Sequence, residues 1–402
     1  MKYIMLVGDG MCDRAVKEFD GKTPLQAARI PNMNMVAKEG QVGIASTIPL
    51  RLTPASDVAN LSLLGYDPNK YYTGRAPLEA ANMGVKLKES DVGFRCNLVT
   101  ISDEKMEDYS AGHIKSKEAG ILIRFLDEKL NLKGVKFYPG ISYRHLTVID
   151  TRQAGIQAKD FLNTICTPPH DITGKRIQRY MPRGKAAAFL TDLMVRSKDI
   201  LMSHDINKVR VDLGENPASM IWLWGQGVNV HIPSFKEKFN VTGSIISAVD
   251  LIKGIGKTIG LDVINVPGAT GYYDTNYKGK ADYAIESLEK HDFVFIHVEA
   301  PDEAGHNGDA RAKIAAIENI DRLIVGSILE HFQKTKQDFR ILITSDHATP
   351  VSVRTHTREP IFFAVYGKGI ARDEVEAFNE IAAYKASVKL KTGFGIIEKL
   401  LK

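Results

Sequence analysis

Short apolar runs alternate with helix-like segments near both ends of this 402-residue chain. Five runs are near-continuous in apolar residues, as strands buried on both faces of a sheet are: residues 4–7, 263–266, 293–298, 341–344 and 361–366. Amphipathic segments lie between them, and one of these begins at Pro31 and ends near Gly40. Alternation of this kind predicts an α/β fold with a largely parallel sheet.

The pattern changes in the middle of the chain. β-type segments are expected at residues 94–102, 136–138 and 143–148. They are mixed with helix-like segments at residues 116–130, 184–207 and 217–222. A chain of this length is too long for one simple core. We therefore expect a discontinuous domain of residues 1–90 and 240–402, interrupted by an α+β domain of residues 91–239.

Composition narrows the function classes only slightly. Apolar residues make up 44% and charged residues 25% of the chain, and the net charge of +5 gives no case for nucleic acid. The three cysteines, Cys12, Cys96 and Cys166, indicate neither a disulfide framework nor a thiolate zinc site, and a reducing cytoplasm fits them best. The first apolar run ends at Asp9, unlike a signal peptide, and no run approaches the length of a membrane span.

Residues of metal-binding type follow several of the predicted strands. Asp9 follows the first run, and Asp346 and His347 follow the run at 341–344. Three further candidates complete the set: Asp302, His306 and His356. Because the carboxyl ends of parallel strands meet at one edge of a sheet, we expect these side chains to converge. Mixed oxygen and nitrogen donors suit divalent Mn, Zn or Co better than Ca, with Mg as an alternative.

Two local questions stay open. Asp302 and His306 are four residues apart, so they share a face if the segment is helical, but Pro301 and Gly305 favour a ligand loop equally. Neighbouring side chains on an extended chain point in opposite directions, so Asp346 and His347 could serve two different ions.

Ser56 is the candidate nucleophile of a two-metal phosphoryl-transfer site. It lies where a loop enters a short helix that stops at Gly65. A serine hydroxyl needs a base or a metal to become nucleophilic, and a helix N-terminus favours phosphate charge. The alternative is that Ser56 or Asp57 simply caps the helix.

The middle block carries polar groups in apolar or proline-rich surroundings. They are Arg95, His113, Arg144, His145, His170 and Asp171. A phosphorylated, carboxylated substrate calls for guanidinium groups that bind carboxylates through two hydrogen bonds. Arg144 is the best candidate, since it follows a Pro139-Gly140 turn at the start of an apolar strand. The alternative for each of these residues is an ordinary surface position.

Several motifs, in combination, resemble those of a known family over almost the whole chain. They are Val7-Gly-Asp-Gly, Pro54-Ala-Ser-Asp-Val-Ala-Asn, Asp108-Tyr-Ser-Ala-Gly-His-Ile, Tyr143-Arg-His, Thr167-Pro-Pro-His-Asp, Val266-Pro-Gly-Ala-Thr-Gly, His297-Val-Glu-Ala-Pro-Asp-Glu-Ala-Gly-His and Thr344-Ser-Asp-His-Ala-Thr-Pro. With these motifs the chain resembles the archaeal-type cofactor-independent phosphoglycerate mutases of the alkaline phosphatase superfamily.

The resemblance implies an alkaline-phosphatase-like three-layer sandwich with an inserted α+β lid domain that binds substrate. One ion would be held by Asp9, Ser56, Asp346 and His347, and the other by Asp302, His306 and His356. The implied reaction interconverts 3-phosphoglycerate and 2-phosphoglycerate through phosphoserine, without 2,3-bisphosphoglycerate. We expect a small phosphorylated substrate and no nucleic-acid or membrane partner; the oligomeric state is open. A phosphotransferase acting on another small alcohol such as homoserine, or a metal-dependent phosphatase, is the alternative.

Overall fold

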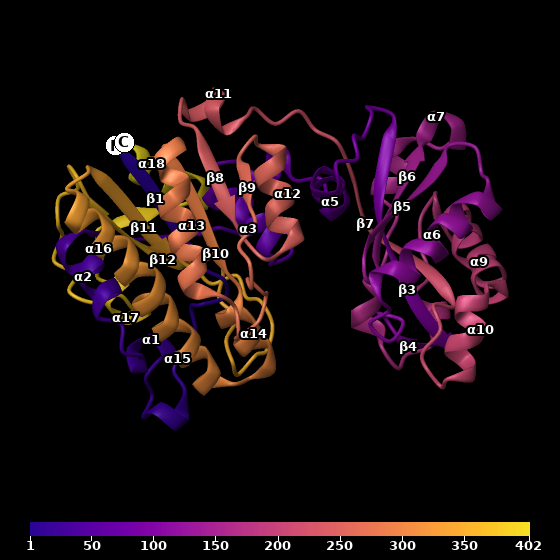
Figure 1. The fold of residues 1–402 in the computed structure, drawn as a ribbon, viewed down its shortest axis with the longest axis horizontal. Coiled ribbons are helices and arrows are strands. Elements are labelled where there is room, and N and C mark those ends of the chain that lie inside the picture. The colour runs from indigo at the N-terminus through magenta and orange to yellow at the C-terminus, as the bar shows by residue number, and fades with distance from the viewer. The chain divides into compact units, whose positions relative to one another are not determined.

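The computed structural model describes all 402 residues, which divide into two compact units. Unit 1 comprises residues 1–72 and 232–402, and unit 2 comprises residues 73–231. Both boundaries lie earlier than the expected insertion of residues 91–239. The first boundary moves because the helix α5 (Arg75–Met83) packs against the strands β3 (Asp91–Ser102) and β7 (Met220–Val228) of unit 2. The second moves because the helix α11 (Phe235–Phe239) packs on unit 1, where Phe235 stacks on Phe293. Figure 1 shows unit 2 in violet to pink.

Unit 1 is built on one eight-stranded sheet. In spatial order its strands are β13 (Val388–Leu390), β2 (Gln41–Ala45), β12 (Ile361–Gly367), β11 (Phe339–Thr344), β1 (Lys2–Gly8), β10 (Phe293–Val298), β8 (Gly243–Ile246) and β9 (Asp262–Ile264). Neighbouring strands are parallel except at β12, which runs antiparallel to both of its neighbours. The central strands are buried on both faces, as their continuous apolar runs predicted.

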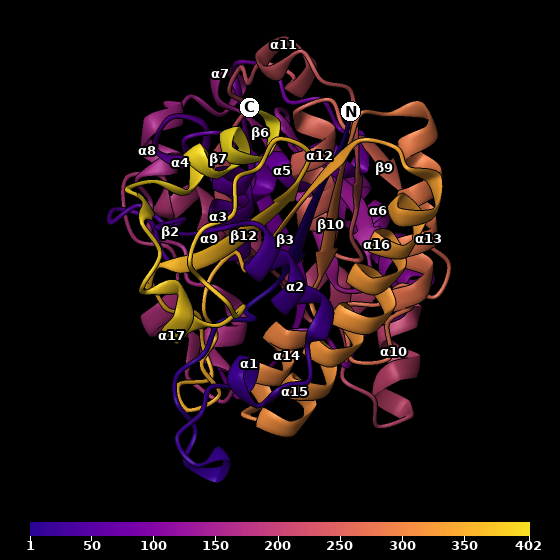
Figure 2. The ribbon, with the colours of Figure 1, turned by 90° about the vertical axis from the view of Figure 1, so that its left-hand side faces the viewer.

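Helices cover both faces of this sheet (Figure 1). One layer contains α2 (Pro31–Glu39), α13 (Tyr277–Lys290) and α16 (Gly326–Thr335). The other contains α3 (Ser56–Leu63), α12 (Asp250–Thr258) and α18 (Ile396–Leu401). Figure 2 looks onto the layer that contains α2 and α16. Unit 1 is therefore the three-layer α/β sandwich that was expected.

Strand register brings the carboxyl ends of the three central strands together. Val7 of β1 lies opposite His297 of β10 on one side and Thr344 of β11 on the other. The next residues along β1 and β11 include Asp9 and Asp346. Polar side chains from distant parts of the sequence thus reach one edge of the sheet, where open α/β folds build their sites.

Unit 2 contains an antiparallel five-stranded sheet. Its other strands are β4 (Lys105–Asp108), β5 (Val135–Ile141) and β6 (Arg144–Asp150). The helices α6 (Ser116–Leu130) and α9 (Ala187–Ser203) pack on one face around a core that includes Phe94 and Leu98. On the other face, α5 packs against Leu146 and Val148.

Two predicted elements of unit 2 are wrong. Residues 217–222, expected as a helix, lead into β7, because Trp222 and its β-favouring neighbours pair with β3 more than a hundred residues away. Residues 184–207, expected as one helix, form α9 and the start of α10 (Asp205–Asp212). The break falls at His204, whose Nδ1 accepts a hydrogen bond from the Ile206 amide at 3.1 Å and starts the second helix.

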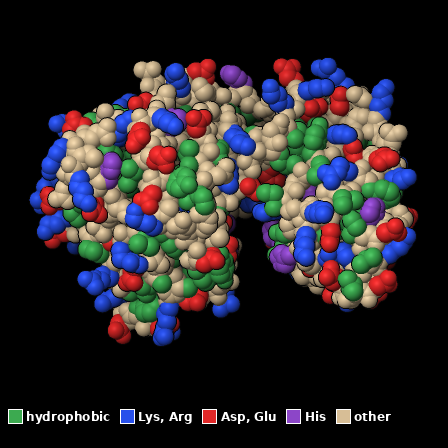
Figure 3. All heavy atoms as spheres, in the orientation of Figure 1, with side chains coloured by type: hydrophobic (Ala, Val, Ile, Leu, Met, Phe, Trp, Pro, Cys, Tyr) green, Lys and Arg blue, Asp and Glu red, His purple; other side chains and the backbone are tan.

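The surface shows no segregation of charge on the face drawn in Figure 3, where basic and acidic side chains are interspersed. This agrees with the small net charge of +5. None of the helices combines the length and the apolar character needed to cross a membrane.

Candidate active site

Asp9 is a fully buried carboxylate without a hydrogen bond. It directly follows β1 and is 1% exposed, and neither of its side-chain oxygens has a hydrogen-bond partner. The Nε2 atom of His297 lies 3.1 Å from its Oδ2 but makes no hydrogen bond to it. Burial, followed by repulsion from Asp346 and Asp302, raises the pKa of Asp9 well above its ordinary value. An uncompensated group of this kind calls for a cation.

Asp346 and His347 turn toward the same point as Asp9. The backbone amide of Gly10 donates to Asp346 Oδ1 at 3.1 Å, and the Asn60 amide donates to Oδ2 at 2.8 Å. His347 Nε2 lies 3.4 Å from both Asp346 Oδ2 and Asp9 Oδ1. The idea that Asp346 and His347 point in opposite directions is therefore wrong, because the chain bends at both residues instead of continuing β11.

Asp302 is surrounded by two imidazoles. It lies with His306 on the helix α14 (Ala300–Asn307), so the helical alternative holds and the loop does not. His306 Nε2 is 3.2 Å from Asp302 Oδ2, His356 Nε2 is 3.5 Å from Oδ1, and the two Nε2 atoms are 2.9 Å apart. Burial alone would raise the pKa of Asp302, but these imidazoles hold that pKa well below its ordinary value. The hydrogen bond with Asp302 raises the pKa of His306 to about 8.

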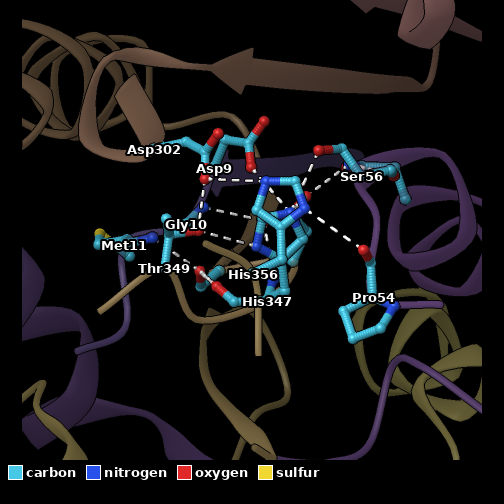
Figure 4. Close-up of polar contacts among 12 residues, drawn as sticks. Asp9, Gly10, Met11, Pro54, Ser56, Asp302, His347, Thr349 and His356 are labelled. Carbon is cyan, nitrogen blue, oxygen red and sulfur yellow. Dashed lines mark hydrogen bonds and ion pairs between the residues drawn. The ribbon is translucent and has the colours of Figure 1, made fainter. Parts of the chain in front are cut away.

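Ser56 is the first residue of α3 and its hydroxyl faces this cluster. The N-cap position belongs to Ala55, so neither Ser56 nor Asp57 is the N-cap, although Asp57 Oδ1 accepts a hydrogen bond from the Val58 amide of the first turn at 3.0 Å. Ser56 Oγ lies 3.1 Å from His347 Nε2. Figure 4 marks the contacts among these residues with dashed lines. Asn60 fixes this end of the helix, because its amide also donates to the Ser56 carbonyl at 2.8 Å.

The donor atoms fall into three overlapping groups, each with ligand atoms within 4.8 Å of one another. They are Asp9, Asp346 and His347; Asp302, His347 and His356; and Asp9, His297 and Glu299. Figure 4 shows Asp9, Asp302, His347 and His356 pointing toward one another. Because several of these buried atoms have no hydrogen-bond partner, and the set mixes carboxylate with imidazole, the residues present fit divalent metal ions. We call the nine side chains the carboxylate–imidazole cluster: Asp9, Ser56, His297, Glu299, Asp302, His306, Asp346, His347 and His356.

Two members of this cluster, His297 and Glu299, were not among the residues proposed from the sequence. Burial raises the pKa of Glu299 to about 8 and lowers that of His297 to about 4. Lys280, also buried, donates its Nζ proton to the His297 carbonyl at 2.7 Å. Their position could have identified them as site residues, because both lie at the carboxyl end of β10, level with the end of β1.

In unit 2, several of the proposed substrate-binding residues gather around aromatic rings. We call this group the aromatic–arginine cluster: Arg75, Arg95, Tyr109, His113, Tyr143, Arg144, His170 and Trp224. The centre of the Tyr109 ring lies 6.5 Å from the ring centre of His113, 5.7 Å from that of Tyr143 and 6.2 Å from that of His170. The ring centre of His170 lies 5.3 Å from that of Trp224.

The two proposed arginines have different surroundings. Arg95 is buried, stacks 4.3 Å from the Trp224 ring centre and places its Nε 3.0 Å from Glu79 Oε1. Burial lowers the pKa of Arg95, and the negative charge of Glu79 offsets part of that decrease. Arg144 is half-buried, lies 5.7 Å from the Tyr143 ring centre and forms no ion pair. Arg144 therefore keeps its charge available for an anion.

Two of the six residues proposed from unit 2 lie apart from these contacts. His145 is 1% exposed, because it follows Arg144 on a strand and points to the opposite face of the sheet. Its Nδ1 accepts a hydrogen bond from the Gly140 amide at 2.9 Å, and burial lowers its pKa to about 3. Asp171 is exposed, and its Oδ1 lies 3.6 Å from His170 Nε2. The geometry gives His145 a place in the core rather than in a binding site.

Similarity to known proteins extends over the whole chain. Residues 37–207 match the family described as 2,3-bisphosphoglycerate-independent phosphoglycerate mutase. A protein of that name from Methanosarcina barkeri is 52% identical over 405 residues, which cover 100% of both chains. The chain belongs to this family. A protein from Geobacter sulfurreducens, named as a probable member, is 47% identical over 406 residues and also covers 100% of both.

Solved structures agree with the family assignment. A protein from Pyrococcus horikoshii superimposes with a TM-score of 0.82 at 30% identity, covering 100% of this chain and 97% of that one. The cofactor-independent phosphoglycerate mutase of Thermoplasma acidophilum gives 0.67 at 28% identity, with coverage of 100% and 99%. The similarity therefore includes the inserted unit as well as the sandwich.

Proposed function

We propose that this chain interconverts 3-phosphoglycerate and 2-phosphoglycerate through a phosphoserine at Ser56, with two divalent ions and without 2,3-bisphosphoglycerate. The observation that carries the proposal is the position of the Ser56 hydroxyl. It caps no helix and lies 3.1 Å from His347 Nε2, at the edge of a buried cluster of ligand-type side chains. Family membership supplies the substrate, since the relatives carry the name of this reaction.

The ligand assignment is the one that the family resemblance implies, and the donor groups support it in part. Asp9, Asp346, His347 and Ser56 would hold one ion, and Asp302, His306 and His356 the other. When bound, divalent ions of this kind neutralise phosphate charge and make a serine hydroxyl acidic enough to react. We expect Mn²⁺, with Zn²⁺, Co²⁺ or Mg²⁺ as alternatives.

The protein's own part in the reaction begins with Ser56. Its Oγ attacks phosphorus while the bond between phosphorus and the glycerate oxygen breaks, and the serine proton ends on that oxygen. The N-terminus of α3 favours the phosphate charge that is then attached to its first residue. Attack by the other hydroxyl of glycerate returns the phosphoryl group and restores the serine.

Unit 2 is the candidate substrate-binding lid. Glycerate must be held between the two transfers, and water must be kept from the phosphoserine, or the enzyme becomes a phosphatase. Arg144 is the candidate clamp for the glycerate carboxylate, because it carries a charge with no ion-pair partner beside the Tyr143 ring. His113, His170 and Arg95 are the supporting candidates from the same cluster.

A direct assay tests the proposal. Purified protein is incubated with Mn²⁺ and 3-phosphoglycerate in the absence of 2,3-bisphosphoglycerate, and both 2-phosphoglycerate and free phosphate are measured. We expect 2-phosphoglycerate with little free phosphate, and loss of both products after chelation. If free phosphate is the main product, the protein is a phosphatase rather than a mutase. No conversion of 3-phosphoglycerate would direct the search to other small alcohols.

A further inference from the structure

Unit 1 contains a cavity of about 840 Å³ that the proposed reaction does not use. Its wall is formed by the segments 46–52 and 391–394, by Arg358 and by residues around α4 (Pro68–Tyr71). The size falls in the range of small-molecule sites, which is about 300–1,000 Å³. No member of the carboxylate–imidazole cluster lines it, so it is a separate compartment.

The charge on this wall is of one sign. Arg51, Arg358 and Lys391 line the cavity, and no aspartate or glutamate does. None of these three residues forms an ion pair anywhere in the structure. Three like charges around one concave surface repel one another and concentrate a positive potential there. A bound anion removes that repulsion.

The three cations differ in how firmly they are held. The guanidinium of Arg358 donates to the carbonyls of Pro49 and Leu52 and is therefore fixed as part of the wall. The side chains of Arg51 and Lys391 are exposed and make no hydrogen bond. These two are free to close on a ligand, while Arg358 supplies a fixed charge.

The remainder of the wall is suited to a ligand with an apolar part. Hydroxyl groups are supplied by Ser46 and Thr392, which can donate to phosphate oxygens. Two aromatic rings, of Tyr72 and Phe394, also line the cavity. Rings of this kind offer flat apolar surface to a planar ligand group.

We propose that this cavity binds a phosphate ester that carries a planar ring, of the size of a nucleoside monophosphate. The phosphate meets Arg51, Lys391 and the hydroxyls, and the ring packs against the aromatic side chains. The site adjoins the catalytic cluster through Thr47, which lines the cavity and donates its hydroxyl proton to the Asp346 carbonyl at 2.6 Å.

Calorimetric titration of the full-length, Mn²⁺-loaded protein with adenosine monophosphate tests the proposal. Saturating 3-phosphoglycerate is present to occupy the active site, and inorganic phosphate and adenosine are titrated separately. We expect saturable binding of adenosine monophosphate that exceeds that of either fragment. The double variant Arg51→Ala/Lys391→Ala should bind about tenfold more weakly, since it loses two phosphate-facing charges.

A matched control removes two other exposed cations of unit 1. Arg29→Ala/Lys389→Ala lowers the net charge equally, and neither residue lines the cavity. This variant should bind adenosine monophosphate like the wild type. The proposal is overturned if the wild type shows no saturable binding, if 3-phosphoglycerate displaces the probe, if inorganic phosphate binds as tightly, or if both double variants weaken binding equally.

Discussion

The two polar clusters of this molecule carry unbalanced charge of opposite sign. In unit 1, the carboxylate–imidazole cluster is buried and leaves both oxygens of Asp9 without a hydrogen bond. In unit 2, the aromatic–arginine cluster places guanidinium groups over rings and leaves Arg144 without an ion pair. The first cluster lacks cations, and in the second the charge of Arg144 has no ion-pair partner. A phosphorylated carboxylate bound with metal ions supplies both the cations and the anionic partner.

The clusters also differ in how rigidly they are held. Carboxylates of the first cluster are fixed by the Gly10 amide, the Asn60 amide and the Thr349 hydroxyl, all buried. Gly10 has φ +57°, and a Cβ there would collide with Asp302 and Thr349. In the second cluster, ring contacts are joined by the Arg95–Glu79 ion pair and by a hydrogen bond from Trp224 Nε1 to Asn97 Oδ1, whereas Arg144 has the Tyr143 ring contact and no ion pair. Substitutions in the first cluster should therefore abolish function, whereas those in the second should change the balance of products.

The largest effect is expected for Ser56→Ala, which removes the proposed phosphoryl acceptor. Turnover of 3-phosphoglycerate should fall on the order of 10⁴-fold or more, because no other group can carry the intermediate. The fold should persist, since the Ser56 side chain caps no helix. Steady-state kinetics and circular dichroism check this. Ser62→Ala, two turns along the same helix, is the control and should keep near wild-type turnover.

The next effect concerns metal content. His306→Ala should lose one ion, because His306 contacts only the Asp302 and His356 side of the cluster. His347→Ala should lose the other ion, since His347 Nε2 lies beside Asp9, Asp346 and Ser56. Metal analysis of the purified variants after dialysis measures the ions per chain. Loss of both ions in either variant would contradict the division of ligands.

A smaller and more selective effect is expected for Arg144→Ala. The mutase rate should fall about 10²-fold, because unclamped glycerate is misplaced or leaves before the second transfer. Formation of phosphoserine should change much less, and free phosphate should appear. Arg152→Ala removes an exposed cation of the same unit and serves as the control. Wild-type mutase rates without phosphate release would show that Arg144 is not the clamp, and would leave Arg95, His113 and His170 as candidates.

The smallest effect is on stability and concerns His145. Its folded pKa, about 3, lies below the ordinary value of 6.5, so between those pH values the unfolded chain binds a proton that the folded chain does not. The stability that the neutral ring contributes is present above pH 6.5 and is lost as the pH falls. The slope should be about 1.4 kcal/mol per pH unit.

The variant His145→Asn isolates this contribution. Its side-chain oxygen can still accept the hydrogen bond of the Gly140 amide, but it does not titrate. Urea unfolding of both proteins between pH 4 and 7 gives the two slopes. Parallel curves would mean that His145 is accessible to protons in the folded protein.

The sequence predicted much of the first cluster because of one rule. Asp9 and Asp346 follow parallel strands, and the ends of such strands converge whatever the details of packing. His297 and Glu299 obey the same rule but were not proposed, since a histidine within an apolar strand looks like a core residue. His347 belongs to two donor groups because the chain bends there, and no local sequence pattern predicts that bend.

The second cluster was harder to predict, because side-chain direction there depends on distant packing. Strand alternation shows that Arg144 and His145 face opposite ways, but not which of them lies beside the rings. That choice is made when α6 and α9 cover one face of the sheet. The strand β7 was likewise missed, since its pairing with β3 joins residues far apart in the sequence.

The central claim is that the buried cluster transfers a phosphoryl group through Ser56, and the most direct measurement is to locate that group. Wild-type protein is mixed with 3-phosphoglycerate and Mn²⁺, quenched in acid during turnover, digested and mapped by tandem mass spectrometry. We predict phosphate on Ser56, and a larger trapped fraction in Arg144→Ala if glycerate leaves faster than water enters. Phosphate on any other residue, or 2-phosphoglycerate formed with no phosphoserine at any time, would contradict the account.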